Sequence, residues 1–261
     1  MQDPFVRVLG SADWLPTPEN DGASYTLNDR ILIDTGWSCV TNMINHHIDP
    51  LQMHTICFTH MHADHYMALP QLILYWRIHC HSLEALTIIG PEASVEEAFQ
   101  RAFHYVFHDA HDVQAEVRGM PTILPLRDGD MLNADDFTIR VCASHHAAPG
   151  LCYRFEHHPS HHTVCFSGDT AYRPEFASFY HDCDLLVHES SFGIAPTTPQ
   201  NNAICKHSSA MDAARVAKEA NAKAMLLTHS LASRRQASVD AARALLDIPV
   251  AWAMPGECFP Y

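Results

Sequence analysis

The stretch that decides the fold is THMHADH at residues 59–65, in which three histidines and an aspartate fall within six positions. The apolar run HTICF (residues 54–58) precedes it, and YMALPQLILYW (residues 66–76) follows. The first run predicts a strand and the second contains a predicted helix, so the motif lies in a loop between them. One histidine alone would indicate an ordinary surface or core residue. Four nitrogen and carboxylate donors this close together predict a metal site, for which zinc is the best match and iron or manganese are substitutes.

Composition restricts the class of protein. The 261 residues, 47% of them hydrophobic, can bury a large core, and we expect a single domain over residues 1–261. The formal net charge of −14 and the lack of a Lys/Arg cluster argue against nucleic acid as a partner. No apolar run could span a bilayer and MQDPFVRVLG lacks a signal core, so we expect a cytoplasmic protein with no membrane partner. Nine cysteines without a CxxC pair predict free buried thiols.

Strand-like and helix-like segments alternate along the chain. Strands are predicted at residues 5–10, 24–36, 54–60, 86–90, 122–126, 137–146, 151–157, 162–169, 184–190, 224–230 and 250–254. Helices are predicted at residues 41–47, 68–79, 93–107, 174–180, 208–222 and 233–246, with a serine able to cap the third. This α/β order favours two packed sheets with helices outside over one wound parallel sheet.

Further metal donors stand where other predicted strands end. His145 and His146 follow FTIRV, Asp169 follows TVCF, and His229 follows AMLL. Each taken singly could be a turn or cap residue. Together with the residue 59–65 motif they complete two metal spheres, with His145 and His146 both open as the ligand.

On these motifs the chain resembles the metallo-β-lactamase-fold hydrolases, and within them the ribonuclease Z and arylsulfatase-like branch. The resemblance implies an αββα four-layer sandwich and two Zn²⁺ per chain. It assigns His60, His62 and His146 to the first zinc, Asp64, His65 and His229 to the second, and Asp169 to both. It selects His146 over His145 by the distance to the Tyr153-Arg154 segment, and it makes Asp34 in LIDTG a residue that supports the site.

Two further matches point to the same branch. The segment HESSF contains Glu189, and KHSSAMDAA contains His207. The resemblance implies that Glu189 orients His207, which then protonates the leaving group, a reasonable role for a carboxylate and imidazole pair. The alternative is that Glu189 pairs locally and that Ser208 or Ser209 only caps the following helix.

The expected activity is hydrolysis of a small phosphodiester or cyclic nucleotide by a metal-bridging hydroxide that Asp64 orients. Ribonuclease Z enzymes have a long tRNA-gripping arm between the segments that match His146 and Asp169, where this chain has room only for a hairpin. The alternatives are ribonuclease Z-like RNA cleavage, arylsulfatase, lactonase or β-lactamase-like hydrolysis, and a metal-dependent sensor without turnover. The resemblance also makes a homodimer plausible.

Two other groups of histidines invite a functional interpretation. His104, His108 and His111 have near-helical spacing, which suits either a cleft lining or, more simply, a solvated face. His157, His158, His161 and His162 surround Pro159-Ser160, which predicts a hairpin tip able to bind metal only adventitiously.

Overall fold

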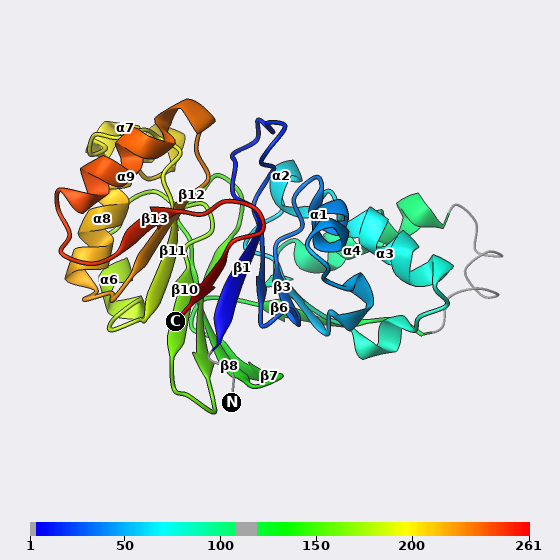
Figure 1. Cartoon of the computed structure of the whole chain (residues 1–261). Coiled ribbons are helices and arrows are strands. Elements are labelled where there is room, and N and C mark those ends of the chain that lie inside the picture. Colours follow the sequence, from blue (N-terminus) through cyan, green and yellow to red (C-terminus); the bar gives the residue numbers. More distant parts are fainter. Residues whose placement is uncertain (1–3, 108–118) are drawn as a thin grey trace.

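In the computed structural model, which describes residues 4–107 and 119–261, the strands form two seven-stranded sheets. The sheets pack face to face, and helices cover their outer faces (Figure 1). A core of buried side chains from both sheets fills the space between them, including Tyr25, Tyr153 and Phe166. The prediction of an αββα sandwich is therefore confirmed.

The first sheet combines an antiparallel half with a parallel half. Its order is β14 (Cys258–Pro260), β1 (Phe5–Gly10), β2 (Ser24–Leu27), β3 (Ile31–Ile33), β4 (Thr55–Cys57), β5 (Thr87–Pro91) and β6 (Thr122–Leu126). Pairing is antiparallel from β14 to β3 and parallel from β3 to β6. The strands β3 and β4 thus end at the same edge of the sheet.

The second sheet repeats this arrangement. Its order is β13 (Val250–Trp252), β12 (Met225–Thr228), β11 (Leu185–Glu189), β10 (Thr163–Phe166), β9 (Leu151–His157), β8 (Phe137–Ala143) and β7 (Met131–Ala134). Pairing is antiparallel from β7 to β10 and parallel from β10 to β13. Every residue of β10, β11 and β12 is buried, as expected for strands covered on both faces. The strands β8, β10, β11 and β12 all run the same way, so their carboxyl ends share one edge.

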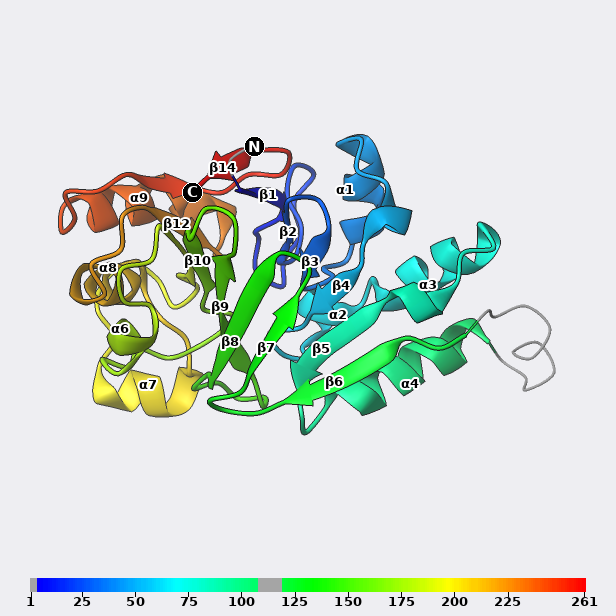
Figure 2. The same cartoon turned by 90° about the horizontal axis from the view of Figure 1, so that it is seen from below.

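Helices pack on the outside of each sheet through separate apolar clusters. The helical segments that follow strands of the first sheet are α1 (Cys39–Asn45), η1 (Pro50–Gln52), α2 (Ala63–Tyr66), α3 (Leu69–Ile78), η2 (Leu83–Ala85) and α4 (Val95–Val106). Those that follow strands of the second are α6 (Phe176–Phe179), α7 (Pro199–Cys205), α8 (Ala210–Glu219), η3 (Ala232–Arg234) and α9 (Arg235–Arg243). Figure 2, seen from below, shows the two groups of helices on opposite sides of the sheets.

Helix caps were predicted with mixed success. Ser209 caps α8, because its hydroxyl accepts a hydrogen bond from the Asp212 N–H and the Asp212 carboxylate accepts one from the Ser209 N–H. Ser94 precedes α4 but makes no side-chain cap hydrogen bond, so the prediction that a serine caps this helix is wrong. Its hydroxyl is buried and has no hydrogen-bond partner among the described residues.

Among the elements that were not predicted, β7, α7 and β14 lack the pattern on which prediction relies. Strand β7 is short and half exposed, helix α7 buries none of its residues, and β14 has three residues of which one is proline. None of them shows the apolar periodicity of a buried strand or helix. Strand β14 nevertheless pairs with β1 and completes the first sheet.

Two expectations from composition can be compared with the structure. Across residues 4–107 and 119–261, no helix combines the length and the apolar character needed to cross a membrane. All nine cysteines are free, but Cys80, Cys205 and Cys258 are exposed. The prediction of buried thiols is therefore wrong for these three.

Candidate metal centre

The residue 59–65 motif lies where the two sheets meet. It starts two residues after β4, and Asp64 and His65 belong to the one-turn helix α2. The prediction that the whole motif lies in a loop is therefore wrong for these two residues. The Leu151 N–H donates to the Thr59 carbonyl oxygen over 2.8 Å, and His60 forms a bridge with Gly150. The motif of the first sheet is thereby fixed directly against β9 of the second.

One group of four donors gathers beside the motif. His60, His62, His146 and Asp169 each offer an atom that lies within 4.8 Å of the others. The His146 Nε2 is 3.0 Å from the His62 Nδ1, and the His60 Nε2 is 3.6 Å from the Asp169 Oδ2. All but His62 are buried. This set contains the residues expected at the first metal.

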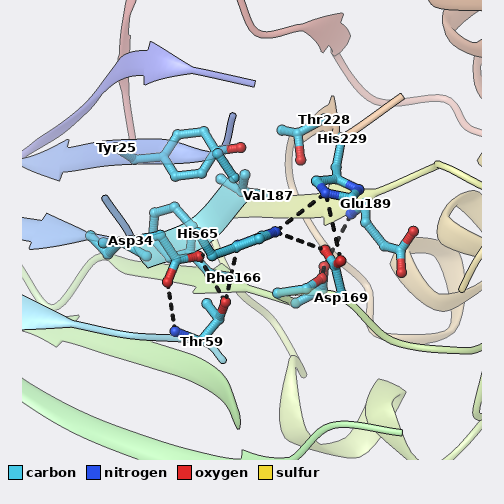
Figure 3. Close-up of a pocket in the computed structure, with 14 residues that line it drawn as sticks. Tyr25, Asp34, Thr59, His65, Phe166, Asp169, Val187, Glu189, Thr228 and His229 are labelled. Atoms are coloured by element: carbon cyan, nitrogen blue, oxygen red, sulfur yellow. Dashed lines mark hydrogen bonds and ion pairs between the residues drawn. The ribbon is translucent and has the colours of Figure 1, made fainter. Parts of the chain in front are cut away.

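A second group adjoins the first. Asp64, His65 and His229 also offer atoms within 4.8 Å of one another, and the His229 Nε2 lies 3.1 Å from the Asp64 Oδ2. Asp169 stands between the groups, since its Oδ1 is 3.5 Å from the His65 Nε2 and its Oδ2 is 3.5 Å from the His229 Nε2. Figure 3 shows Asp169 facing both His65 and His229. The placement suits a carboxylate shared by two cations.

The structure separates the adjacent histidines after β8. His146 is buried in the first donor group, whereas His145 is half-buried and its ring nitrogens lie 3.0 and 3.2 Å from the Arg173 guanidinium. A ring packed against a guanidinium is poorly placed to bind a second cation. The geometry therefore favours His146 as the donor.

Neighbouring residues contact the ring nitrogen of His65 and His146 that does not face the donor groups. The His65 Nδ1 is 2.7 Å from the Asp34 Oδ2, and the His146 Nδ1 is 3.0 Å from the Lys206 carbonyl oxygen. Asp34 also accepts hydrogen bonds of 2.7 Å from the Thr59 N–H and hydroxyl. Partners of this kind fix the ring and leave the opposite nitrogen for a metal. Asp34 thus occupies the supporting position expected for it.

The chemistry of the donor set fits a bound cation. The His60 Nε2 and Asp169 Oδ1 are buried without a hydrogen-bond partner among the described residues, although each is a strong polar group. Such orphaned atoms are costly in a protein interior unless a ligand satisfies them. Mixed imidazole and carboxylate donors at this spacing suit zinc, iron or manganese.

The charges of the centre are strongly coupled. Burial and the neighbouring His65 hold the pKa of His60 well below its usual value. At His229 burial acts in the same direction, but Asp169 and Asp64 outweigh it and raise the pKa to about 10. Burial would raise the pKa of Asp169, yet the surrounding histidines, His229 first, bring it well below its ordinary value. The carboxylate is therefore ionised, as a metal ligand must be.

A carboxylate and imidazole pair lies next to the donors. The Glu189 Oε1 is 2.9 Å from the His207 Nδ1, and the Ser191 hydroxyl lies 2.9 Å from the same nitrogen. Burial lowers the pKa of His207, but Glu189 outweighs this and raises it to about 9. His207 also belongs to a third donor group with Asp169 and His229. The structure contains both contacts expected of this segment, since Ser209 caps α8 and Glu189 contacts His207.

Sequence reasoning missed two contributors. Ser191 contacts both Glu189 and His207, and the Lys206 carbonyl orients His146 from a left-handed backbone position (φ 53°). Ser191 stands two residues after Glu189, the one signal that could have identified it. A backbone carbonyl leaves no signal in the sequence.

Among the residues that the structure describes, the remaining histidines form no further metal-donor group. His157, His158, His161 and His162 lie around the turn between β9 and β10, which confirms the hairpin, but they form no donor cluster within the part of the chain that the structure describes. Two of these rings are engaged elsewhere, since His158 contacts Thr138 and His162 contacts the Tyr261 carbonyl. His104 is exposed on α4, which matches the solvated face, while His108 and His111 lie outside the described residues.

Known proteins are similar to this chain over most of its length. The family described as the beta-lactamase superfamily domain matches residues 29–230. The ribonuclease Z of Methanosarcina mazei is 24% identical over 274 residues, and the probable metallo-hydrolase YhfI of Bacillus subtilis is 25% identical over 230 residues; both matches cover 86% of each chain. The crystal structure of YhfI superposes with a TM-score of 0.81 at 23% identity over the whole of both chains.

These similarities agree with the resemblance seen in the motifs. They also concern the expectation that nucleic acid is not a partner. A relative named for ribonuclease activity gives no support to the exclusion of nucleic acid drawn from net charge. The matched span covers Asp34 through His229 and so includes every donor described above. The chain belongs to the β-lactamase superfamily of metal-dependent hydrolases and has the metallo-β-lactamase fold.

Proposed function

We propose that the chain is a dinuclear zinc-dependent phosphodiesterase that acts on small phosphodiesters such as cyclic nucleotides. The observation that carries this proposal is the pair of donor groups that share Asp169, with Glu189 and His207 beside them. Two cations can bind both sides of a phosphodiester, and a nearby protonated imidazole can serve its leaving group.

The first cation would be held by His60, His62 and His146 and the second by Asp64, His65 and His229, with Asp169 between them. Bound zinc would supply an activated water and neutralise negative charge on the phosphoryl group. Iron or manganese could take the same place, because the donors suit all three.

The chain's own residues would position the reactants and move protons. The Asp64 Oδ2, which lies 3.1 Å from the His229 Nε2, can accept a proton from a water beside the second donor group and orient that water. His207 would give its proton to the departing alkoxide oxygen, and Glu189 would hold the imidazole and stabilise its charged form. The Ser191 hydroxyl would support the same pair.

The proposed substrate is small because of the β9–β10 connection. Strands β9 and β10 pair directly, with residues 157–162 between their last paired positions, so this interval forms a hairpin and no arm. The runner-up is ribonuclease Z-like cleavage of RNA, which the M. mazei relative favours. Against it stands a net charge of −14, which opposes binding of a long phosphate backbone.

The test is metal quantification on the purified protein, followed by a substrate panel. The panel consists of bis(p-nitrophenyl) phosphate, cyclic nucleotides, a tRNA precursor, an aryl sulfate and a lactone. Turnover of the diesters with two metals per chain is expected. Two bound metals without diester turnover would rule out the phosphodiesterase, and preferential cleavage of the RNA would favour the runner-up.

A further inference from the structure

A cleft of about 720 Å³ opens over the candidate metal centre. Asp64, Asp169, His207 and His229 line it. Trp14 and Trp37 line the same cleft. Donors for two cations and two large aromatic side chains therefore face one cavity, which is large enough for a nucleotide-sized ligand.

These two tryptophans are more exposed than the other two tryptophans of the chain. Trp14 is 72% exposed and Trp37 is 40% exposed, whereas Trp76 is buried and Trp252 is half-buried. Neighbouring Leu15, also in the cleft, is 57% exposed. A cluster of exposed apolar side chains beside a polar centre marks a binding surface, because it leaves a large apolar area in water until a ligand covers it.

The loops that carry the tryptophans are packed tightly against the metal motif. A Cβ at Gly22, at the end of the Trp14 loop, would lie 2.4 Å from the Asp64 carbonyl oxygen. A Cβ at Gly36, next to Trp37, would lie 2.3 Å from the Gly22 carbonyl oxygen. Only glycine at positions 22 and 36 allows the backbones of residues 36, 22 and 64 to approach one another this closely. Both tryptophans are thus placed relative to Asp64 by backbone contacts.

Hydrogen bonds fix the Trp14 loop internally as well. The Asn20 side-chain oxygen accepts from the Ser11 N–H over 2.9 Å, and Thr17 and Asn20 exchange backbone hydrogen bonds of 2.8 and 3.2 Å. The Asp13 carboxylate accepts from the Leu15 N–H over 2.9 Å, directly around Trp14. A loop held in this way presents Trp14 without the entropic cost of ordering a flexible segment.

Residues of the second sheet line the rest of the cleft. Phe192 follows β11, and Leu231 and Arg234 follow β12. The Arg234 guanidinium is directed to the Ser191 carbonyl oxygen over 3.4 Å. One arginine among the described lining residues, with Asp13 also present, does not suit a polyanion. It suits a ligand whose charge is concentrated at the metal centre and whose remainder is apolar.

We propose that Trp14 and Trp37 bind a flat aromatic group of the substrate, so that the substrate class is a phosphodiester in which one ester group carries a nucleobase or a comparable aryl ring. This inference rests on the proposed function, since it places the phosphoryl group at the shared donors. The faces of indole rings stack on any planar ring, which makes the contact selective for aromatic over aliphatic esters.

The test is calorimetric binding of three phosphomonoesters to the zinc-loaded full chain: adenosine 5′-monophosphate, ribose 5-phosphate and phenyl phosphate. The expected result is that adenosine 5′-monophosphate binds roughly tenfold or more tightly than ribose 5-phosphate. Trp14→Ala and Trp37→Ala should each reduce this ratio and leave the affinity for ribose 5-phosphate unchanged. Phenyl phosphate shows whether one ring suffices or whether a nucleobase is required.

Controls separate stacking from folding. Trp14→Phe keeps a planar ring and should retain most of the preference, while Tyr105→Ala removes a 74% exposed aromatic residue of α4 outside the cleft and should change nothing. Equal affinities for adenosine 5′-monophosphate and ribose 5-phosphate would overturn the inference, as would an unchanged ratio in a folded Trp14→Ala, Trp37→Ala double variant. These ligands require no turnover, so the result is distinct from a failure of the diesterase assay.

Discussion

The His207 Nδ1 lies 2.9 Å from the Glu189 Oε1, and that same carboxylate oxygen accepts the Thr170 N–H over 2.7 Å. Glu189 is fully enclosed, while His207 borders the cleft. A buried carboxylate that is held by the backbone can fix the orientation of an imidazole and favour its protonated form. Glu189 therefore fixes the position of His207, and the pair has the geometry of a proton donor that borders the cleft.

Replacing His207 with alanine should slow esters with poor leaving groups far more than activated ones. An alkyl leaving group needs a proton, so its hydrolysis should fall by roughly 10²- to 10⁴-fold, whereas a nitrophenolate leaves without help. The measurement is kcat for a methyl and a p-nitrophenyl diester with each variant. Glu189→Gln should show the same pattern with a smaller loss. Equal losses on both substrates would contradict the proton-donor role.

Replacing His146 with alanine should lower the metal content, and replacing His145 should not. His146 belongs to a buried donor group, whereas His145 contacts Arg173 at the surface. The two residues are adjacent, so the pair is its own matched control. Elemental analysis of both purified variants after dialysis against a weak chelator measures the difference. Full metal content in the His146→Ala protein would remove this residue from the ligand set.

Asp34→Asn should weaken metal binding although Asp34 is not a proposed ligand. The change leaves an acceptor beside His65 but removes the charge that orients its imidazole, and losses at such supporting residues are typically about 10- to 100-fold in affinity. Competition with a fluorescent zinc chelator gives the affinity. Asp29→Asn is the control, because Asp29 shares a positive φ with Asp34 but pairs with Arg7. A wild-type affinity in Asp34→Asn would show that the contact is only structural.

Gly22→Ala should destabilise the fold and disturb the metal motif together. The new Cβ would meet the Asp64 carbonyl oxygen at 2.4 Å, and such overpacking costs roughly 1–3 kcal/mol. Urea unfolding measures the loss. Gly129→Ala provides the comparison, since its Cβ would meet nothing within 4 Å and only its positive φ of 83° opposes the change. A smaller loss at Gly22 than at Gly129 would argue against the close approach.

Asp184→Ala should cost stability at neutral pH and progressively less in acid. Burial raises the pKa of Asp184, but hydrogen bonds from the Lys223 ammonium and the Thr163 N–H outweigh it, and the net shift is downward. A carboxyl with a depressed folded-state pKa stabilises the protein above its unfolded pKa of about 3.9 and loses that effect as the pH falls through the folded value. The variant should be about 1 kcal/mol less stable at pH 7, because the exposed Lys223 ammonium is screened by solvent and contributes little.

Unfolding titrations of wild type and Asp184→Ala between pH 3 and pH 7 test this directly. The difference in unfolding free energy should be constant near neutrality and shrink below about pH 4. Lys223→Met removes one of the two residues that donate to Asp184, leaving Thr163, and should give an intermediate loss. A difference that stays constant down to pH 3 would show that Asp184 acts through packing alone.

The residues that could be predicted are those whose position follows from strand direction. Asp169 and His229 each come just after a strand of the second sheet, and the carboxyl ends of its parallel strands meet at one edge, so their convergence was foreseeable. His60 follows β4 of the first sheet, so its place beside them depends on how the two sheets pack. The choice between His145 and His146 did not follow from the residues themselves. Adjacent loop residues face different ways, and only the resemblance or the structure separates them.

Other features had no signal in the sequence. The part played by the Lys206 carbonyl depends on backbone conformation, and the exposure of Trp14 and Trp37 depends on which loops lie beside the cleft. Tryptophan is usually placed in a core by sequence reasoning, because most of its surface is apolar. The short elements β7, α7 and β14 escaped because each buries too little to show periodicity.

The candidate donors are divided between the sheets: His60, His62, Asp64 and His65 follow β4, whereas His146, Asp169 and His229 follow β8, β10 and β12. Cations held by this set would connect the two sheets of the sandwich. The free energy of metal binding would then add to the free energy that holds the two sheets together. At a free metal concentration a hundred times the dissociation constant, this linkage contributes about 2.7 kcal/mol to the folded state. Chelation would then loosen the seam between the sheets as well as stop the chemistry.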